Sequence, residues 1–498
     1  MALLTFPVLL AAAALLCAVA LAKKFYSPLA RIPGSKLSLF SSVQLRYHEL
    51  QGRRTAFVHS MHQRYGTAVR LGPNEVSFAS ASAMKEIYMS KGSGYDKTDF
   101  YDLFRQFGLS TMFSDKKKEP VWYSLLSMLA TRLLMDYVSF QHSKRRRILA
   151  DRYANSNIMR EDSLHGIQQR SQNFVTRIKE SQQQGFDIYL HLHNYAFDCV
   201  THHLFHPYGS NSLLDKGDEE IMCEVSFDNS LVRRLMIFYN PTFGHFLGKM
   251  GLFGAQRAIP RAQALVKNAV NQENSASFTL VGALQDGKGS LDSTQIASEC
   301  MDHMVAGIET TGDALCFLMW QLSQPAYVGL QDRLRAELRE NANMSIHELP
   351  FLDAVVKEGL RVFPSIPMSL PRCVPAGGAT VDGYRLPEGT TVSCQPFSMH
   401  RMDEDVFPAP DSFDPDRWLE EKGNADRNRL FFSFSGGGRA CIGRHLATAE
   451  MKTLLRDIYG QFRSTPADEM TADMTMDDQI FTTRPKGQKC LLNFTVVE

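Results

Sequence analysis

A single cysteine late in the chain carries the strongest chemical signal of the sequence. Cys441 follows three consecutive glycines and Arg439, and Gly443 then precedes a helical pattern from Arg444 to Leu454. The N–H groups and positive dipole at the start of a helix stabilise a thiolate. Glycines let the backbone approach a flat ligand closely, and Arg439 suits an anionic group on that ligand. An axial thiolate ligand of haem iron requires this pattern, whereas the alternative is a buried structural cysteine beside a glycine turn.

A second chemical signal lies in Ala306-Gly-Ile-Glu-Thr-Thr311, in the middle of a long helical pattern. Glycine inside a helix costs about 1 kcal/mol relative to alanine, and we interpret Gly307 as making room for O₂ beside the helix. Thr310 can then donate a hydrogen bond to the bound oxygen, and Glu309 can help to deliver the two protons that oxygen activation needs. The alternative is a glycine that serves helix packing beside a solvated glutamate.

The elements that must position these residues are mostly helices. Apolar residues at three- and four-residue spacing predict helices over Thr294 to Leu322, Val328 to Glu340 and Phe351 to Phe363. Short strand patterns occur near Thr67 to Arg70, Ala379 to Val381 and Thr391 to Ser393. With no repeat or linker after residue 34, the pattern predicts one large, mainly α domain with small β-sheets (α+β) over residues 35–498.

Charge and cysteine usage exclude several classes of protein. Lys and Arg total 54 and Asp and Glu total 53, so the net charge of +1 lacks the basic excess of a nucleic-acid binder. The nine cysteines are scattered and no Cys-x-x-Cys pair occurs, which argues against a zinc knuckle or a disulfide framework. A reducing compartment is therefore expected for most of the chain.

The first 22 residues predict a membrane anchor. They contain no charged side chain, and Lys23, Lys24 and Arg31 follow on the C-terminal side only. About 20 apolar residues span a bilayer as a helix, and the flanking cations place the remaining chain in the cytosol. The rival interpretation is a cleaved signal peptide ending near Ala22. Pro28 and Pro33 then predict a stiff hinge over residues 23–34.

The motif Phe434-x-x-Gly437-x-Arg439-x-Cys441-x-Gly443 resembles the signature of the cytochrome P450 family of haem-thiolate monooxygenases. The resemblance extends over nearly the whole chain. It implies the cytochrome P450 fold, and it implies that Cys441 is the proximal ligand of the iron of haem b, with Phe434, Gly437 and Gly443 beside the cofactor.

Further residue roles follow from the same resemblance. It implies that cations bind the two haem propionates, at His142, Arg146, Arg372 and Arg439, with His400 as a further candidate. It also implies a structural ionic triad of Glu358, Arg361 and Arg417. Two of the three arginines at 145–147 are expected to form a solvated basic face that, with Lys144, could meet an acidic electron donor.

One segment departs from the family pattern. Residues 121–141, from Val121 to Gln141, are extra between Pro120 and His142. One interpretation is a helix that contacts the membrane or covers the pocket. The other is a retained intron of a fungal-type gene, because valine codons begin with GT and one glutamine codon ends with AG.

The resemblance implies that one atom of O₂ enters a hydrophobic small molecule, with electrons from NADPH through a cytochrome P450 reductase in the endoplasmic reticulum membrane. Secondary-metabolite biosynthesis is the expected setting. The segments expected to contact the substrate are Gly92 to Phe104, Phe227 to Phe246, His303 and Met304, Ile366 to Ser369, and Phe481 with Thr482. The alternatives are a haem-thiolate isomerase or dehydratase that needs no reductase, and a non-enzymatic membrane-anchored protein.

Overall fold

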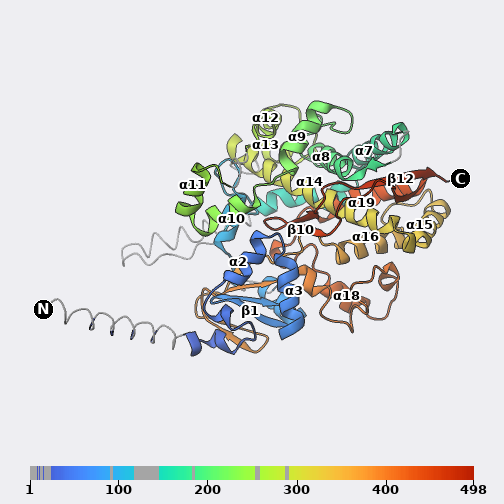
Figure 1. Ribbon diagram of the computed structural model, residues 1–498. Helices are drawn as coiled ribbons and strands as arrows, with labels where there is room; N and C mark the ends of the chain where they lie inside the picture. The colour runs from blue at the N-terminus through green and yellow to red at the C-terminus, as the bar shows by residue number, and fades with distance from the viewer. Residues whose placement is uncertain are drawn as a thin grey trace.

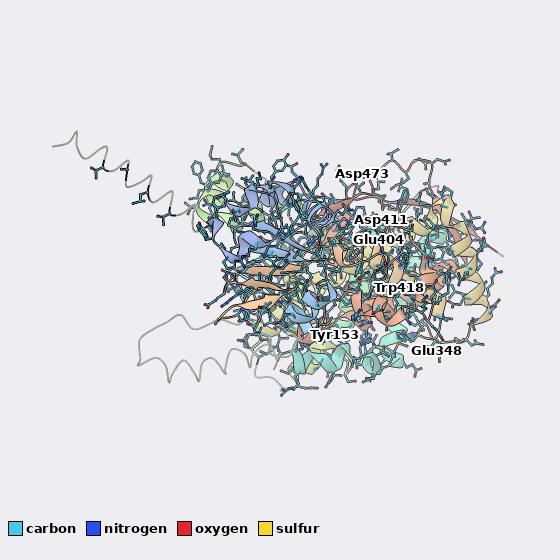
Figure 2. All side chains as sticks on the ribbon, turned by 90° about the horizontal axis from the view of Figure 1, so that it is seen from below. Tyr153, Glu348, Glu404, Asp411, Trp418 and Asp473 are labelled. Carbon is cyan, nitrogen blue, oxygen red and sulfur yellow. The ribbon has the colours of Figure 1, made fainter. Side chains whose placement is uncertain are left out.

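The chain folds into a mainly helical body, as its sequence predicts, with small sheets at separate places in that body (Figure 1). The computed structural model describes Val8, Ala11, Leu15, Val19 and residues 24–89, 94–116, 145–181, 185–252, 258–286 and 291–497. Side chains fill the space between helices and sheets throughout this body (Figure 2).

The helices of the described part follow one another along the chain in two groups. The first group is η1 (Pro28–Arg31), η2 (Leu37–Leu39), α2 (Val43–Leu50), α3 (Arg54–Tyr65), α4 (Ala81–Met84), η3 (Lys85–Met89), η4 (Asp99–Phe104), α6 (Asn155–Ile158), α7 (Glu161–Glu180), α8 (Ile188–Phe205), α9 (Lys216–Ser226), α10 (Leu231–Tyr239), α11 (Pro241–Lys249), α12 (Pro260–Val270) and α13 (Leu280–Gln285). The second group is α14 (Ser293–Ser323), η5 (Pro325–Tyr327), α15 (Val328–Glu340), α16 (Pro350–Val362), α17 (Pro396–Met399), η6 (Pro415–Trp418), α18 (Asn424–Leu430), η7 (Gly437–Arg439) and α19 (Arg444–Tyr459).

The strands of the described part form four sheets. The largest has the order β1-β2-β8-β5-β3, with β1 (Ala68–Gly72), β2 (Glu75–Phe78), β8 (Thr391–Cys394), β5 (Arg372–Cys373) and β3 (Asp96–Lys97). The second has the order β4-β12-β9, with β4 (Phe186–Asp187), β12 (Leu491–Val496) and β9 (Phe462–Pro466). The two remaining pairs are β6 (Ala379–Val381) with β7 (Tyr384–Leu386), and β10 (Met476–Asp478) with β11 (Thr483–Pro485).

Several predicted boundaries are confirmed to within two residues. The predicted helices at 294–322, 328–340 and 351–363 are α14, α15 and α16, and the predicted strands at 67–70, 379–381 and 391–393 are β1, β6 and β8. The Asp382-Gly383 turn signal joins β6 to β7, with positive φ angles of 48° and 80°. These elements carry clear local signals of spacing and turn chemistry.

The central helix α14 begins at a capping box. The Asp292 side chain accepts a hydrogen bond from the N–H of Gln295 at 2.9 Å, and the Gln295 side chain accepts one from the N–H of Asp292 at 3.0 Å. This reciprocal pair satisfies two donors that the helix itself leaves unpaired. From this start α14 runs through the body and packs along α8, α16 and α19 (Figure 1).

Two glycines set the close approach of α14 to α8. A Cβ atom at Gly307 would lie 2.6 Å from Val200 Cγ2, and one at Gly312 would lie 3.1 Å from the ring of His193. Because Val200 and His193 both belong to α8, helix packing alone accounts for both glycines. The packing interpretation of Gly307 is therefore the one that the contacts support.

The segment before the first strand is bound to the body. Leu29 and Ile32 are 3% and 1% exposed, and the buried Arg70 guanidinium donates to their carbonyl oxygens at 2.9 and 2.8 Å. Of the expected anchor, residues 1–22, the structure describes only four positions. Within the described residues no helix combines the length and the apolar character needed to cross a membrane.

Candidate active site

The loop that carries Cys441 is held by hydrogen bonds on both sides of the cysteine. The N–H of Cys441 donates to the carbonyl oxygen of Phe434 at 2.8 Å. The Arg146 guanidinium donates to the carbonyl oxygen of Ala440 at 2.9 Å. Helix α19 begins three residues after the cysteine, at Arg444, so the sulfur lies next to a helix N-terminus. These hydrogen bonds hold the backbone on both sides of Cys441.

The glycines before Cys441 have different environments. At Gly437, φ is +67° and a Cβ atom would lie 2.1 Å from the carbonyl oxygen of Tyr88, so no other residue is accommodated. A Cβ atom at Gly436 would lie 2.5 Å from Met89 Cε, whereas one at Gly438 would meet nothing within 4 Å. Two of the three glycines therefore pack against the end of η3, and only Gly438 borders open space.

The surroundings of the Cys441 sulfur act on its pKa in opposite directions. Burial of the loop raises the pKa of the thiol, while the N–H groups of Gly443 and Arg444 and the charges of Arg146 and Arg444 lower it. Although the loop is densely surrounded, the Cys441 side chain itself is exposed. A soft metal centre on the open side of the sulfur would stabilise the thiolate that these donors favour.

Three cations, two of them buried, gather at the Cys441 loop. Lys97 on β3 and Arg372 on β5 are opposite each other in the sheet, and they are 7% and 3% exposed. Burial, together with the charges of Arg439 and Arg372, lowers the pKa of Lys97 well below its ordinary value. Burial and the charge of Arg372 likewise lower the pKa of Arg439. The three cations therefore lie close enough to repel one another.

The partners of these cations are neutral oxygens. Arg372 donates to the Tyr101 hydroxyl at 2.6 Å, Arg439 donates to the carbonyl of Asp115 at 3.2 Å, and Lys97 donates to the carbonyl of Phe113. Nearby carboxylates also act on these cations, because the charges of Asp302 and Asp115 raise the pKa of Lys97 and those of Asp96 and Asp115 raise that of Arg439, against the lowering by burial. An anionic ligand, such as the haem propionates would supply, would stabilise the cluster further.

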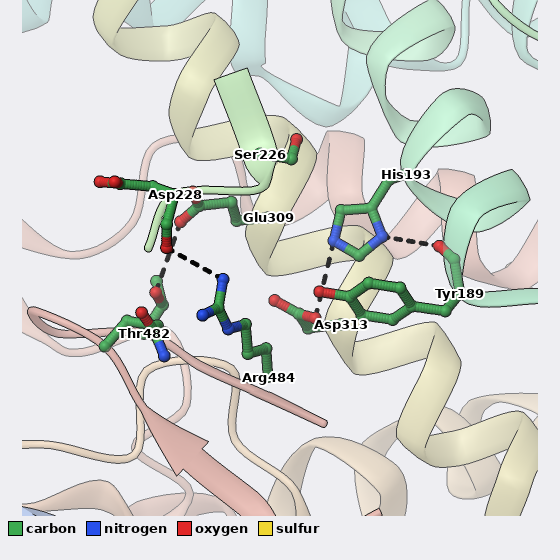
Figure 3. A pocket seen from close by; sticks show the side chains of 9 residues that line it. Tyr189, His193, Ser226, Asp228, Glu309, Asp313, Thr482 and Arg484 are labelled. Carbon is green, nitrogen blue, oxygen red and sulfur yellow. Dashed lines mark hydrogen bonds and ion pairs between the residues drawn. The ribbon is translucent and has the colours of Figure 1, made fainter. Parts of the chain in front are cut away.

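The two candidate catalytic residues on α14 point to different surroundings. The Thr310 hydroxyl donates to the carbonyl of Ala306 at 2.7 Å, and Ala306 is exposed although most of α14 is buried. The carboxylate of Glu309 instead accepts a hydrogen bond from the Thr482 hydroxyl at 3.4 Å and lines a small polar cavity (Figure 3). Open space thus borders the helix at Ala306, while Glu309 lies on its polar side.

Comparison with known proteins decides the family. The family model described as Cytochrome P450 matches residues 113–492, which is more than three quarters of the chain. The chain belongs to the cytochrome P450 family. Its enzyme class is therefore cytochrome P450 monooxygenase, and membership implies a haem whose iron has a thiolate ligand.

Curated relatives agree with this assignment over nearly their full length. Cytochrome P450 monooxygenase orf2 of Aspergillus niger is 28% identical, with 94% of this chain and 93% of the relative covered. Cytochrome P450 monooxygenase tazI of Aspergillus terreus is 28% identical, with 94% of each chain covered. Cytochrome P450 monooxygenase stcB of Emericella nidulans is 26% identical, with 95% of this chain and 89% of the relative covered.

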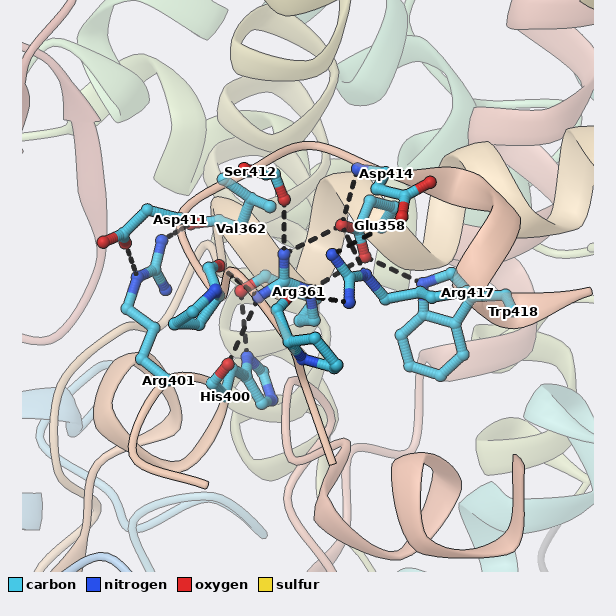
Figure 4. Close-up of polar contacts among 12 residues, drawn as sticks. Glu358, Arg361, Val362, His400, Arg401, Asp411, Ser412, Asp414, Arg417 and Trp418 are labelled. Carbon is cyan, nitrogen blue, oxygen red and sulfur yellow. Dashed lines mark hydrogen bonds and ion pairs between the residues drawn. The ribbon is translucent and has the colours of Figure 1, made fainter. Parts of the chain in front are cut away.

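In this cytochrome P450, Glu358 is the centre of a buried ionic network (Figure 4). The Arg361 guanidinium forms two hydrogen bonds of 2.8 Å to the two oxygens of Glu358, and Arg417 Nε donates to Oε1 at 3.1 Å. The Trp418 indole and the N–H of Asp414 each add one hydrogen bond of 2.9 Å. Glu358 and Arg361 are both 0% exposed. Five N–H donors therefore replace the water molecules that the Glu358 carboxylate loses on burial.

The structure removes one candidate for haem binding and corrects the expected basic face. His400 is fully buried, and its Nδ1 and Nε2 atoms bond to the carbonyl of Arg361 at 3.0 Å and the N–H of Phe432 at 2.8 Å, so neither is left for a propionate. The expectation that two of the three arginines at 145–147 face solvent is wrong. Arg145 pairs with the buried Glu299 at 2.8 Å, and only Arg147 is exposed.

Parts of three predicted substrate segments meet in one aromatic cluster. Phe104 packs against Phe481, Phe113 and Phe100, with ring centroids 4.6, 5.3 and 5.4 Å apart. Leu235 of α10 joins the same buried group. Phe113 was missed by the sequence reasoning because no spacing pattern links it to the other rings.

Two other residues predicted to contact the substrate, His303 and Met304, are mostly buried. His303 Nδ1 lies 2.6 Å from the Tyr153 hydroxyl.

Some predicted features lie outside the described residues. These are His142, Lys144, the whole of the extra segment 121–141 and the first part of the predicted substrate segment at Gly92. Sequence reasoning missed Lys97 as a neighbour of Arg372 and Arg439, because the position of Lys97 opposite Arg372 depends on the pairing of the two strands.

Proposed function

We propose that this cytochrome P450 binds haem through Cys441 and inserts one atom of O₂ into a hydrophobic small molecule of fungal secondary metabolism. The observation that carries the proposal is the exposed residue Cys441 on a hydrogen-bonded loop, with N–H groups at the start of α19 and a cluster of cations nearby. Bound haem supplies the oxygen chemistry, in which one oxygen atom enters the substrate and the other leaves as water.

The residues of this chain would then hold the cofactor in three ways. Cys441 ligates the iron, Phe434 and Gly443 border the ligand loop, and Gly437 keeps the loop against η3. We assign Arg146, Arg372 and Arg439 to the propionates, as the resemblance implies, and we add Lys97 because it lies opposite Arg372 in the sheet. His142, which lies outside the described residues, keeps its predicted role as a further propionate ligand. Two propionates carry two negative charges, which cations on this side would neutralise and bind through charge-assisted hydrogen bonds.

The residues of α14 supply protons and orient oxygen. Thr310 is placed beside the open space at Ala306 and carries a hydroxyl that can donate to an oxygen ligand. Glu309 is the adjacent acid, and its carboxylate faces a polar cavity rather than the apolar side of the helix. We assign Thr310 the role of hydrogen-bond donor and Glu309 that of proton carrier. The ionic network of Glu358, Arg361 and Arg417 has the role of holding the core in shape.

The substrate class follows from the aromatic cluster. Phe100, Phe104, Phe113 and Phe481 offer large apolar faces and few polar groups, which suits a hydrophobic, polycyclic or terpenoid molecule. Electrons would come from NADPH through a cytochrome P450 reductase. We place residues 1–22 in the endoplasmic reticulum membrane as a single-pass anchor, with the catalytic domain in the cytosol; the exposed Phe25 and Tyr26 next to that segment support an interfacial position.

Oxygen labelling tests the proposed reaction. The purified enzyme, a reductase, NADPH and ¹⁸O₂ are incubated with an extract of a strain from which the gene has been deleted. We expect one accumulated metabolite to gain a single ¹⁸O atom, and only when NADPH is present. Conversion of that metabolite without NADPH or O₂ would contradict the proposal and would favour an isomerase or dehydratase.

Two variants connect the reaction to α14. Thr310→Val and Glu309→Gln should each lower the labelled product about 10²-fold, the lower end of the range for losing a proton donor. Both variants should keep bound haem. A wild-type rate in both variants would contradict the roles assigned to these residues.

A further inference from the structure

A small cavity on the polar side of α14 joins Glu309 to a second buried acid. Its lining includes Asp313 and Glu309 on α14, His193 and Tyr189 on α8, and Arg484 on β11 (Figure 3). The volume open to the centre of a water molecule is about 20 Å³, which is room for one water molecule or two. Glu309 and Asp313 are four residues apart and therefore lie on the same face of the helix.

Asp313 is buried without a complete set of hydrogen bonds. It is 3% exposed, and its Oδ1 atom has no hydrogen-bond partner. His193 Nε2 lies 3.6 Å from this atom, which is longer than a hydrogen bond. An unpaired carboxylate oxygen in such a position would cost several kcal/mol, so a neutral carboxyl group with a water molecule beside it is the stable form.

The neighbours of Asp313 favour this protonated form. Burial and the charge of Glu309 raise the pKa of Asp313 well above its ordinary value, although Arg484 acts in the opposite direction. His193 is neutral at pH 7, because burial lowers its pKa to about 4. Its Nδ1 lies 2.8 Å from the carbonyl of Tyr189, which assigns the ring proton to Nδ1 and leaves Nε2 as an acceptor facing Asp313.

One residue of the cavity lining also reaches the surface of the protein. Asp228, in the loop after α9, lines the cavity and has a side chain that is 13% exposed. Arg484 donates to the carbonyl oxygen of Asp228 at 3.1 Å and to the side chain of Asn229 at 3.0 Å, so this loop is fastened across the cavity. Thr482 also lines the cavity and donates to Glu309. Asp313 thus shares one cavity with the partly exposed Asp228 and with Glu309, the acid beside Thr310 (Figure 3).

We propose that Asp313 is the proton store that recharges Glu309 during turnover, through a water molecule in this cavity. The O–H bond of the Asp313 carboxyl breaks as an O–H bond forms on the Glu309 carboxylate, and the Asp313 carboxylate then takes a proton from solvent through water beside Asp228. The inference rests on the proposed role of Glu309 and extends it to a residue that acts only through Glu309.

The first test compares two variants that each remove one buried carboxyl group. Asp313→Asn removes the acid that lines the cavity. Glu450→Gln is the matched control, because Glu450 is 1% exposed, has a pKa raised to about 8 by burial, and lies on α19 away from the cavity lining. Both proteins are prepared with haem, and the spectrum of the reduced protein with CO confirms that each is loaded and folded.

The readouts separate proton supply from general damage. With reductase and NADPH, we expect Asp313→Asn to lower the rate of NADPH oxidation about tenfold. This effect is smaller than the loss of about 10²-fold expected when a direct proton donor is removed. The ratio of the rates in H₂O and D₂O should increase. Oxidation of a surrogate dye with hydrogen peroxide should stay within about twofold, because the peroxide brings its own protons. Infrared spectra in H₂O and D₂O should show several protonated carboxyl bands, of which one is absent in Asp313→Asn and shifted in Glu309→Gln, while Glu450→Gln loses a different band.

The outcomes are distinct. An unchanged NADPH oxidation rate and isotope ratio in Asp313→Asn overturns the proposal, as does an equal loss in the NADPH and peroxide reactions or an equal loss in Glu450→Gln. A wild-type protein without NADPH oxidation would instead contradict the proposed function. If Asp313→Asn takes up no haem, Asp313→Ser gives the same comparison with a smaller side chain and room for another water molecule.

Discussion

The buried carboxylate of Glu358 offers a perturbation whose magnitude follows from its contacts. Glu358→Gln keeps the size of the side chain but removes its charge, which leaves Arg361 and Arg417 without their common anion. Arg361 is 0% exposed and Arg417 is 4% exposed, so water cannot replace the carboxylate. One Gln oxygen can still accept hydrogen bonds, whereas its NH₂ group would face guanidinium and indole donors that now lack an acceptor.

The expected cost is large for a single substitution. Breaking a buried ion pair by removing one partner costs about 3–5 kcal/mol. The entropy of unfolding is about 2 cal/mol/K per residue, so over 498 residues each kcal/mol corresponds to about 1 °C. We therefore expect the melting temperature of Glu358→Gln to fall by about 3–5 °C.

Differential scanning calorimetry of the haem-loaded protein, at equal haem excess, measures this change. The control is Glu220→Gln, which makes the same chemical change in the exposed pair of Glu220 with Arg261, where the side chains are 61% and 57% exposed. Screening by water limits that pair to less than about 1 kcal/mol. Equal shifts in the two variants would refute the reasoning, because burial would then not determine the strength of the Glu358 network.

Three further predictions follow from single positions. Gly437→Ala should lose most of its haem, measured by the haem content per protein, because its Cβ would overlap the carbonyl of Tyr88, whereas Gly438→Ala has open space and should keep it. Gly307→Ala should lower the free energy of unfolding by about 1–3 kcal/mol in urea through its clash with Val200, and Val200→Ala should restore part of the loss. His203 has a pKa lowered from 6.5 to about 3, mainly by burial, so its stabilising contribution is complete above pH 6.5 and is lost as the pH falls towards 3. His203→Phe, which keeps the ring contact with Tyr153, should reduce the slope of unfolding free energy against pH in that window by up to about 1.4 kcal/mol per pH unit; an unchanged slope would contradict the assignment.

The parts of the fold and site that sequence reasoning predicted are those with local signals. The helix of Val328–Glu340 follows from its apolar spacing, and Glu358 with Arg361 lie one helical turn apart. Cys441 is recognisable because its glycines, arginine and helix start are contiguous. In each case the physical requirement lies within about ten residues of chain, so the residue types themselves report it.

The parts that sequence reasoning missed depend on contacts between distant segments. Lys97 becomes a partner of Arg372 only when β3 and β5 pair, and the ion pair of Arg145 with Glu299 joins positions 154 residues apart. Gly307 was interpreted as space for O₂, but Val200 of α8 occupies that side of the helix. Burial also decides which acids are neutral, and Asp313 has no sequence feature that separates it from a solvated aspartate.

The central claim is that the sulfur of Cys441 ligates haem iron. The most direct measurement is the absorption spectrum of the reduced, CO-bound protein, comparing the wild type with Cys441→Ser and with Cys223→Ser, a partly exposed cysteine on α9. The account predicts the red-shifted Soret band of a thiolate-ligated haem in the wild type and in Cys223→Ser, and its absence in folded Cys441→Ser. A folded Cys441→Ser protein that keeps this band would contradict the account.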